Sequence, residues 1–289
     1  MSKIGLTESQ VAQYERDGFT VCPDFLSSDN LAAMSAEIDT ISQGHTLADH
    51  DSARLEMEPN QPPDGSRVRR IYDPGSRYPL FVELSESPRL LDCLEQLIGP
   101  NIYFASSKLN MKPPEIGSVV EWHQDFSYGP RTNPDSLAVL VYLDDVDREN
   151  GCLQIMPGYH KRGLLDHTHE GFFQGRITEE LNTSEVVDIE GSAGTAIFMH
   201  CLSPHASSTN RSERPRRTLI LSYLATDSYP IYCGEMTHFG ESNRRLVRGE
   251  PSRVARFELK EIAIPCYEHS VVSLYEIQSQ YQEEESGSQ

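Results

Sequence analysis

Short runs of apolar residues, bounded by Gly, Pro or Asn, recur through the middle of the chain. Runs of this length with turn residues between them are typical of the strands of a β-sandwich or β-barrel. No long helical pattern separates them, which argues against a parallel sheet connected by helices. We therefore expect a mainly β fold. The expected strands are residues 102–111, 118–126, 137–143, 152–156, 186–189, 195–200 and 216–225.

Helical patterns come before this series of strands. Thr7 and Gln10 fit a capping box, Ser27 precedes apolar residues at helical spacing, and residues 88–98 repeat that spacing. We expect these helices to support a sheet from outside, with residues 43–66 as a polar loop. The pattern as a whole predicts a double-stranded β-helix, the cupin-type jelly roll, with flanking helices.

Length and charge narrow the class of protein. The chain has 289 residues, and its 44 acidic and 25 basic residues give a net charge of −19, which disfavours binding to nucleic acid or anionic membranes. We predict one domain over residues 1–277 and a disordered tail over 278–289. The chain has six scattered cysteines without a Cys-x-x-Cys pair, and we find neither a signal peptide nor a membrane-spanning run in the sequence. From these features we expect a cytoplasmic protein. The oligomeric state cannot be read from the sequence.

Candidate metal ligands lie in the expected strand 118–126. Side chains alternate across a strand, so His123 and Asp125 should share one face. A histidine and a carboxylate in this arrangement are two of the three ligands of the 2-His-1-carboxylate triad of non-haem Fe(II) oxygenases. The same alternation directs Trp122 the opposite way, and we expect it to pack in the core toward the helices.

Two histidines compete for the third ligand position. Eleven residues after His205 comes Arg216, at the start of a predicted strand, whereas the same step from His200 reaches Arg211 in a polar loop. An arginine can bind a carboxylate with two hydrogen bonds, and an oxygenase that consumes 2-oxoglutarate needs such an anchor on a rigid element. We therefore expect His205 with Arg216, and we expect His200 to be a partly buried histidine at a strand end.

Several motifs together resemble the phytanoyl-CoA dioxygenase family of Fe(II)/2-oxoglutarate oxygenases. The resemblance extends from about Leu6 to about Gly249, and its motifs occur in the family's order and at its spacing. The motifs are His-Gln-Asp at 123–125, the turn-containing segment 147–160, Pro-His-Ala-Ser at 204–207 and Arg-Pro-Arg-Arg at 214–217.

This resemblance implies an enzyme that uses Fe(II), 2-oxoglutarate and O2 to oxidise, by default to hydroxylate, a C–H bond. By the resemblance, His123, Asp125 and His205 are the iron ligands. The carboxylate at position 125 argues for oxygenation, because related halogenases have a small residue there. The residues implied for 2-oxoglutarate are Arg216 at its distal carboxylate, Ser207 beside it, and Lys108 on the first core strand.

The substrate side is less defined. Phe126 and Tyr128 follow the ligand strand and either line a substrate pocket or pack as core aromatics. Arg69, in an expected strand over 67–72, either faces the mouth of the site or belongs to a solvated edge. The long connection 157–185 contains aromatic residues and is expected to form a lid.

We expect the substrate to be a small metabolite or a natural-product intermediate. An acyl-CoA is an alternative, because local arginines offset the overall negative charge. Two other functions use the same three ligands. One is a cupin-like module that binds or senses a ligand without turnover, and the other is a zinc-dependent hydrolase or isomerase, which has no use for a carboxylate anchor at Arg216.

Overall fold

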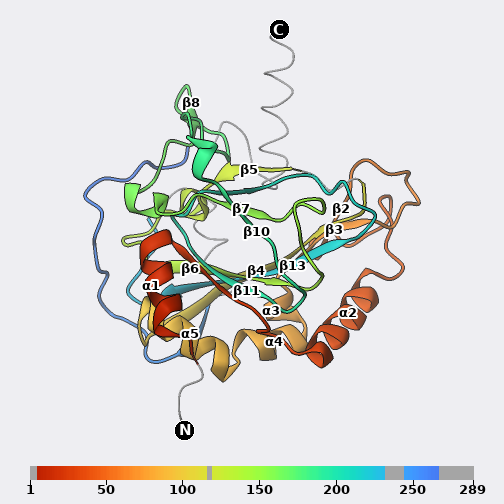
Figure 1. Cartoon of the computed structure of the whole chain (residues 1–289), viewed down its shortest axis with the longest axis horizontal. Helices are drawn as coiled ribbons and strands as arrows, with labels where there is room; N and C mark the ends of the chain where they lie inside the picture. Colours follow the sequence, from red (N-terminus) through yellow and green to blue (C-terminus); the bar gives the residue numbers. More distant parts are fainter. Residues whose placement is uncertain (1–4, 116–118, 232–243, 267–289) are drawn as a thin grey trace.

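The computed structural model describes residues 5–115, 119–231 and 244–266 (Figure 1). Two sheets of antiparallel strands lie face to face, with the helices below the larger one in Figure 1, which confirms the predicted jelly roll. The larger sheet has the order β1-β11-β6-β13-β4-β3-β2, and β14 also pairs with β4. Its strands are β1 (Phe19–Cys22), β2 (Leu55–Met57), β3 (Val68–Tyr72), β4 (Ile102–Lys112), β6 (Ser136–Tyr142), β11 (Ala196–His200), β13 (Arg216–Ala225) and β14 (Arg245–Arg248).

The smaller sheet contains the segments that carry the predicted metal ligands. Its order is β10-β7-β12-β5, and a separate two-stranded ribbon, β8 with β9, lies beside it. These strands are β5 (Val120–His123), β7 (Leu153–Ile155), β8 (Thr168–His169), β9 (Phe172–Phe173), β10 (Val187–Ile189) and β12 (His205–Ser207).

Helices cover the outer face of the larger sheet. The Thr7 side chain accepts a hydrogen bond from the backbone N–H of Gln10 and so caps the first helix, as the sequence predicts. None of the helices in the described part of the chain is long and apolar enough to cross a membrane. The helices are α1 (Glu8–Asp17), α2 (Ser28–Ser42), α3 (Pro74–Arg77), α4 (Pro79–Ser85) and α5 (Pro88–Ile98).

Alternation along the strands divides the buried residues into two cores. On β6, Val139 and Val141 pack against the helices, whereas Leu140 and Tyr142 point between the two sheets. On β13, Leu219 belongs to the core beneath the helices. The residues at even positions from 216 to 222 therefore project toward the smaller sheet. We call this side of the larger sheet the inner face.

Two elements differ from the sequence prediction at the ligand segment. β5 ends at His123, and Asp125 begins a 3-10 turn over Asp125–Tyr128 rather than lying in the strand. Gln124 keeps extended backbone angles, so the alternation persists as far as Asp125. Trp122 is only half-buried and lies in the smaller sheet, away from the helices (Figure 1). The prediction that it packs in the core toward the helices is therefore wrong.

Some elements have no clear signal in the sequence. The expected polar loop 43–66 contains β2, and the three residues of β12 are too few to show a periodicity.

The connection 157–185 is fastened to the ligand strand, because Ile177 N–H donates to Trp122 O at 2.7 Å and Leu165 N–H donates to Gln124 Oε1 at 2.8 Å. Its action as a lid stays a prediction, as does the single domain over 1–277. The predicted tail 278–289 lies outside the described residues.

Candidate active site

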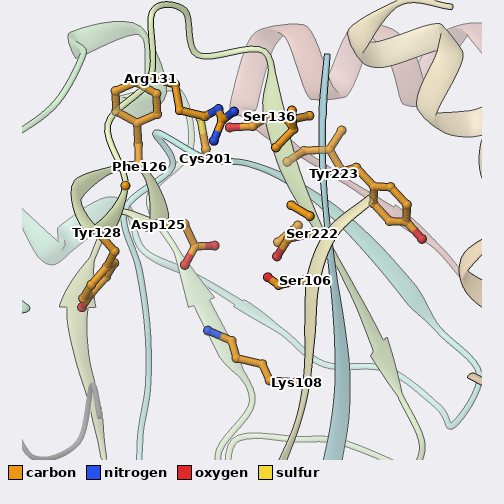
Figure 2. A pocket seen from close by; sticks show the side chains of 15 residues that line it. Ser106, Lys108, Asp125, Phe126, Tyr128, Arg131, Ser136, Cys201, Ser222 and Tyr223 are labelled. Carbon is orange, nitrogen blue, oxygen red and sulfur yellow. The ribbon is translucent and has the colours of Figure 1, made fainter. Parts of the chain in front are cut away.

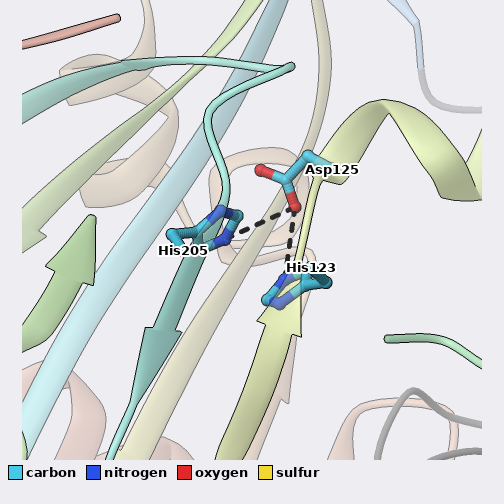
Figure 3. Close-up of side chains that lie close together, drawn as sticks. All are labelled: His123, Asp125 and His205. Atoms are coloured by element: carbon cyan, nitrogen blue, oxygen red, sulfur yellow. Dashed lines mark ion pairs between the residues drawn. The ribbon is translucent and has the colours of Figure 1, made fainter. Parts of the chain in front are cut away.

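His123, Asp125 and His205 converge on one point between the sheets (Figure 3). One potential ligand atom from each side chain lies within 4.8 Å of the other two. The Asp125 Oδ1 atom is 3.8 Å from His123 Nε2 and 4.0 Å from His205 Nε2. These separations suit three donors around a single ion, since each metal–ligand bond is about 2.0–2.2 Å long.

The two histidines meet because β5 and β12 are neighbours in the smaller sheet. His205 lies opposite His123 in the antiparallel register, and their ring centroids are 4.1 Å apart. His123 Nδ1 donates to Glu121 O at 2.7 Å, and His205 Nδ1 donates to Ser203 O at 3.0 Å. With Nδ1 protonated, each ring presents the lone pair of Nε2 toward Asp125, as a metal ligand must.

Burial also sets the protonation states of the site. It lowers the pKa of His123 well below the ordinary value and lowers the pKa of His205, so both rings are neutral at neutral pH and can bind a metal. Burial alone would raise the pKa of Asp125, but the nearby His205, Lys108 and His123 lower it below its ordinary value. The site therefore offers two neutral imidazoles and one carboxylate.

His200 does not belong to this group. It ends β11 in the larger sheet, where its ring centroid lies 5.3 Å from that of His160 and 6.0 Å from that of Tyr14. Its Nδ1 accepts a hydrogen bond from Leu202 N–H at 3.0 Å. The structure brings His205 to Asp125 and leaves His200 beside the first helix.

One end of the inner face carries two buried basic side chains, and we call it the anchor end. Arg216 is 4% exposed and lies opposite Lys112 in the pairing of β13 with β4. The Arg216 guanidinium lies 5.9 Å from the centroid of the Tyr142 ring. The Lys112 ammonium donates to Ser207 O at 3.2 Å and to Ser208 O, and thereby joins the larger sheet to β12.

The anchor end has buried donors that lack acceptors. Arg216 Nε and Thr218 Oγ1 are inaccessible to solvent and make no hydrogen bond within the described residues. Both side chains project from β13 on the inner face, two residues apart. A buried donor without an acceptor is destabilising, so these atoms fit a site for an anionic or polar ligand.

Arg69 also lies toward the anchor end. It is 7% exposed, and its Nη1 is 3.8 Å from Glu56 Oε1. The positive charge of Arg69 lowers the pKa of nearby Glu58, but burial dominates and raises that pKa above its ordinary value. Arg69 is not among the described residues that line the cavity below, so the structure does not bring it to the substrate side.

The opposite end of the inner face opens into a cavity of about 260 Å³, which we call the cavity end (Figure 2). In Figure 2, Lys108 and Arg131 lie at opposite ends of this cavity, with Asp125 between them. Phe126 and Tyr128 line it, and the Tyr128 hydroxyl donates to Gly175 O in the connection 157–185. The other described lining residues are Ala105, Ser106, Gly129, Ser136, Leu137, Ala138, Cys201, Ser222, Tyr223 and Leu224.

Sequence reasoning missed three residues at these two ends. Lys112 shares the inner face with Lys108, four positions along β4, so strand alternation could have found it. Tyr142 could have been found in the same way, as the last residue of an apolar strand. Arg131 lies in a segment without periodicity, and the sequence gives no signal for its place in the cavity.

Three known proteins are similar to this chain over most of its length. The chain is 29% identical over 264 residues to a probable alpha-ketoglutarate-dependent hypophosphite dioxygenase of Stutzerimonas stutzeri, covering 89% of this chain and 91% of that protein. It is 26% identical to L-proline trans-4-hydroxylase of Streptomyces griseoviridis, covering 76% of this chain and 87% of that protein. The crystal structure of EctD from S. alaskensis with 2-oxoglutarate and 5-hydroxyectoine matches with a TM-score of 0.64 and 26% identity, covering 87% of this chain and 88% of that one.

A structure of the same S. alaskensis protein with bound Fe also matches, with a TM-score of 0.64 and 26% identity over 88% of this chain and 87% of that one. The family model for phytanoyl-CoA dioxygenase matches residues 14–218, which is most of the chain. The chain therefore belongs to the phytanoyl-CoA dioxygenase family and is an iron- and 2-oxoglutarate-dependent dioxygenase.

Proposed function

We propose that His123, Asp125 and His205 bind the ferrous ion, and that the enzyme hydroxylates a C–H bond of a small molecule held at the cavity end. The observation that supports this most is the convergence of the three side chains, with both imidazoles fixed as metal-binding tautomers. When bound, iron and 2-oxoglutarate supply the oxidising power: O2 is reduced, 2-oxoglutarate loses CO2 to become succinate, and one oxygen atom enters the substrate.

The anchor end fits the distal carboxylate of 2-oxoglutarate. Arg216 has a buried Nε donor without an acceptor, and a guanidinium binds a carboxylate through two parallel hydrogen bonds. Ser207, buried in β12 two residues after His205, is proposed to assist it. We also propose that Lys108, which lies close enough to Asp125 to be influenced by its charge, contacts the cosubstrate beside the metal.

The cavity end is proposed to hold the substrate. The relatives named for hypophosphite and L-proline act on small polar molecules, and the EctD structure contains 5-hydroxyectoine, another small polar molecule. The cavity here is small and has three serine hydroxyls in its lining. A long acyl chain would need more room than a cavity of about 260 Å³ provides. The carboxylate at Asp125 occupies one metal position and supports oxygenation over halogenation.

The test measures succinate formed from 2-oxoglutarate by the purified protein. We expect succinate in air with Fe(II), and we expect none without O2 or with Zn(II) in place of Fe(II). Activity with Zn(II) that ignores O2 would instead indicate a hydrolase, and tight binding of iron and 2-oxoglutarate without succinate from any candidate substrate would indicate a sensing module.

A further inference from the structure

Gln124 stands between two of the proposed metal ligands, but its side chain points away from the metal. His123 and Asp125 share one face of the extended segment, so the alternation directs Gln124 to the opposite face. Gln124 is fully buried, and its side-chain amide makes three hydrogen bonds. All three partners are backbone groups from other parts of the chain, so this residue attaches the ligand segment to its surroundings.

One of these bonds holds the short loop that leads to the third ligand. Gln124 Nε2 donates to the carbonyl oxygen of Leu202 at 2.6 Å, in the loop between β11 and β12. The next residue, Ser203, is fully buried, and its carbonyl oxygen accepts from His205 Nδ1 at 3.0 Å. Gln124 therefore helps to fix the position of the group that orients the His205 ring.

The other bonds of Gln124 hold the connection 157–185. Gln124 Nε2 also donates to Gly163 O at 2.9 Å, and Gln124 Oε1 accepts from Leu165 N–H at 2.8 Å. The backbone N–H of Gln124 donates at 3.1 Å to Nε2 of His167, which is 4% exposed. His167 Nδ1 donates to Leu165 O at 2.8 Å, which leaves the lone pair of Nε2 to accept. Three nearby residues of the connection are thus bonded to one residue of the ligand segment.

We propose that Gln124 is a positioning residue that couples the metal site to the connection 157–185, so that iron binding and the closed connection stabilise each other. This inference rests on the proposed function, because it assumes that His123, Asp125 and His205 bind the ferrous ion. A buried amide with partners on both sides cannot follow one of them without losing its bonds to the other, and each lost bond leaves a buried polar group unsatisfied. Such coupling is reciprocal, because the order that the metal adds to the connection equals the affinity that the closed connection adds to the metal site.

The coupling has a use at the cavity end. The connection reaches the cavity where Gly175 O accepts a hydrogen bond from the hydroxyl of Tyr128, which lines it. An iron site that is most stable when this part of the wall is in place favours reaction in a closed cavity, away from bulk water.

Hydrogen exchange measured with and without the metal tests this coupling. Exchange over residues 163–178 is followed without O2, in the metal-free protein and with Fe(II) alone. In wild type we expect Fe(II) to slow the exchange of amides of the connection, Leu165 among them, by roughly 5-fold or more, which is the lower end of typical coupling between sites. Gln124→Met keeps a long side chain but removes all three amide bonds. In this variant the exchange should be fast, Fe(II) should no longer slow it, and the affinity for Fe(II) should fall by about the same factor.

Gln174→Met is the matched control. Gln174 is also a buried glutamine, 2% exposed, but its amide donates to Phe172 O at 3.1 Å, within the connection itself. Its loss should speed exchange locally and leave both the slowing by Fe(II) and the affinity for Fe(II) near the wild-type values. His167→Phe removes one bond between Gln124 and the connection and keeps an aromatic ring. It should lose part of the slowing, and it is the second variant if Gln124→Met fails to fold.

A Gln124 that only stabilised the fold would give faster exchange in Gln124→Met with the same ratio between the metal-free and Fe(II) states. The proposal is overturned by that result, by Fe(II) that binds wild type without slowing the connection, or by a Gln174→Met protein that loses the slowing as well. Each of these outcomes leaves the proposed function standing. A wild-type protein that does not bind Fe(II) would instead contradict the proposed function, and the coupling with it.

Discussion

The anchor end and the cavity end lie on the same face of the same two strands, yet they are built differently. At the anchor end, Lys112 and Arg216 are buried and face each other across the regular β4–β13 ladder. At the cavity end, Ser106 and Ser222 are paired in the same ladder, but the rest of the wall includes the non-strand residue Arg131. A cosubstrate shared by a whole family can be bound by fixed ladder positions, whereas a substrate particular to one enzyme is selected by loops that vary.

The largest expected effect lies at the metal, between these two ends. His205→Ala should abolish Fe(II)-dependent succinate formation, with a loss above the roughly 10- to 100-fold typical of removing only a hydrogen-bond partner of a ligand. His200→Ala should retain activity, because His200 ends a strand of the other sheet beside the first helix. The measurement is succinate release together with iron content after gel filtration.

Comparing His205→Ala with His200→Ala distinguishes the loss of a metal ligand from a general loss of stability. Burial lowers the pKa of His200 to about 4, so both variants remove a neutral imidazole that is at least partly buried, and a general loss of stability should affect both. An active His205→Ala protein with an inactive His200→Ala protein would show that the wrong histidine was assigned to the metal.

The next effect should be confined to the anchor end. Arg216→Ala should raise the KM for 2-oxoglutarate by about 10- to 100-fold and change kcat much less, because it removes a charged hydrogen-bond pair from the part of the cosubstrate that does not react. Arg217→Ala is the matched control. Arg217 is the next residue on β13, but its guanidinium binds Asp144 at 2.7 Å and Ser35 at 2.8 Å, away from the site.

Steady-state kinetics with varied 2-oxoglutarate distinguish the two arginines. Arg217→Ala should lower the melting temperature and leave the KM for 2-oxoglutarate near the wild-type value. If both variants raised this KM equally, 2-oxoglutarate binding would depend on the integrity of β13 as a whole and not on the Arg216 guanidinium in particular.

The sequence alone predicts those parts of the site that depend on strand alternation and on the spacing between residues. Strand alternation correctly predicts that His123 and Asp125 share a face, and the step of eleven residues favours His205 over His200. Alternation does not reveal which sheet a strand joins, and for this reason the prediction for Trp122 is wrong. Arg131 could not be predicted, because its place depends on contacts with Ser228, 97 residues away in the chain.

The smallest expected effect comes from Lys112, which links the two sheets at the anchor end without being expected to touch either substrate. Lys112→Met should weaken 2-oxoglutarate binding by about 10-fold, because the carbonyl oxygens of Ser207 and Ser208 lose the ammonium that holds β12. Anaerobic titration of the Fe(II) protein measures this binding, and Lys161→Met at an exposed position is the control.

A second substitution tests whether Lys112 supports 2-oxoglutarate binding by holding β12 in place or only by its charge. Lys112 lowers the pKa of buried Glu58, so Lys112→Met leaves a carboxylate less compensated in the same region. Adding Glu58→Gln should recover much of the melting temperature but little of the 2-oxoglutarate affinity, because the neutral amide relieves the charge without restoring the hold on β12. Recovery of both together would mean that Lys112 serves the charge balance of the anchor end, and that β12 keeps its position without it.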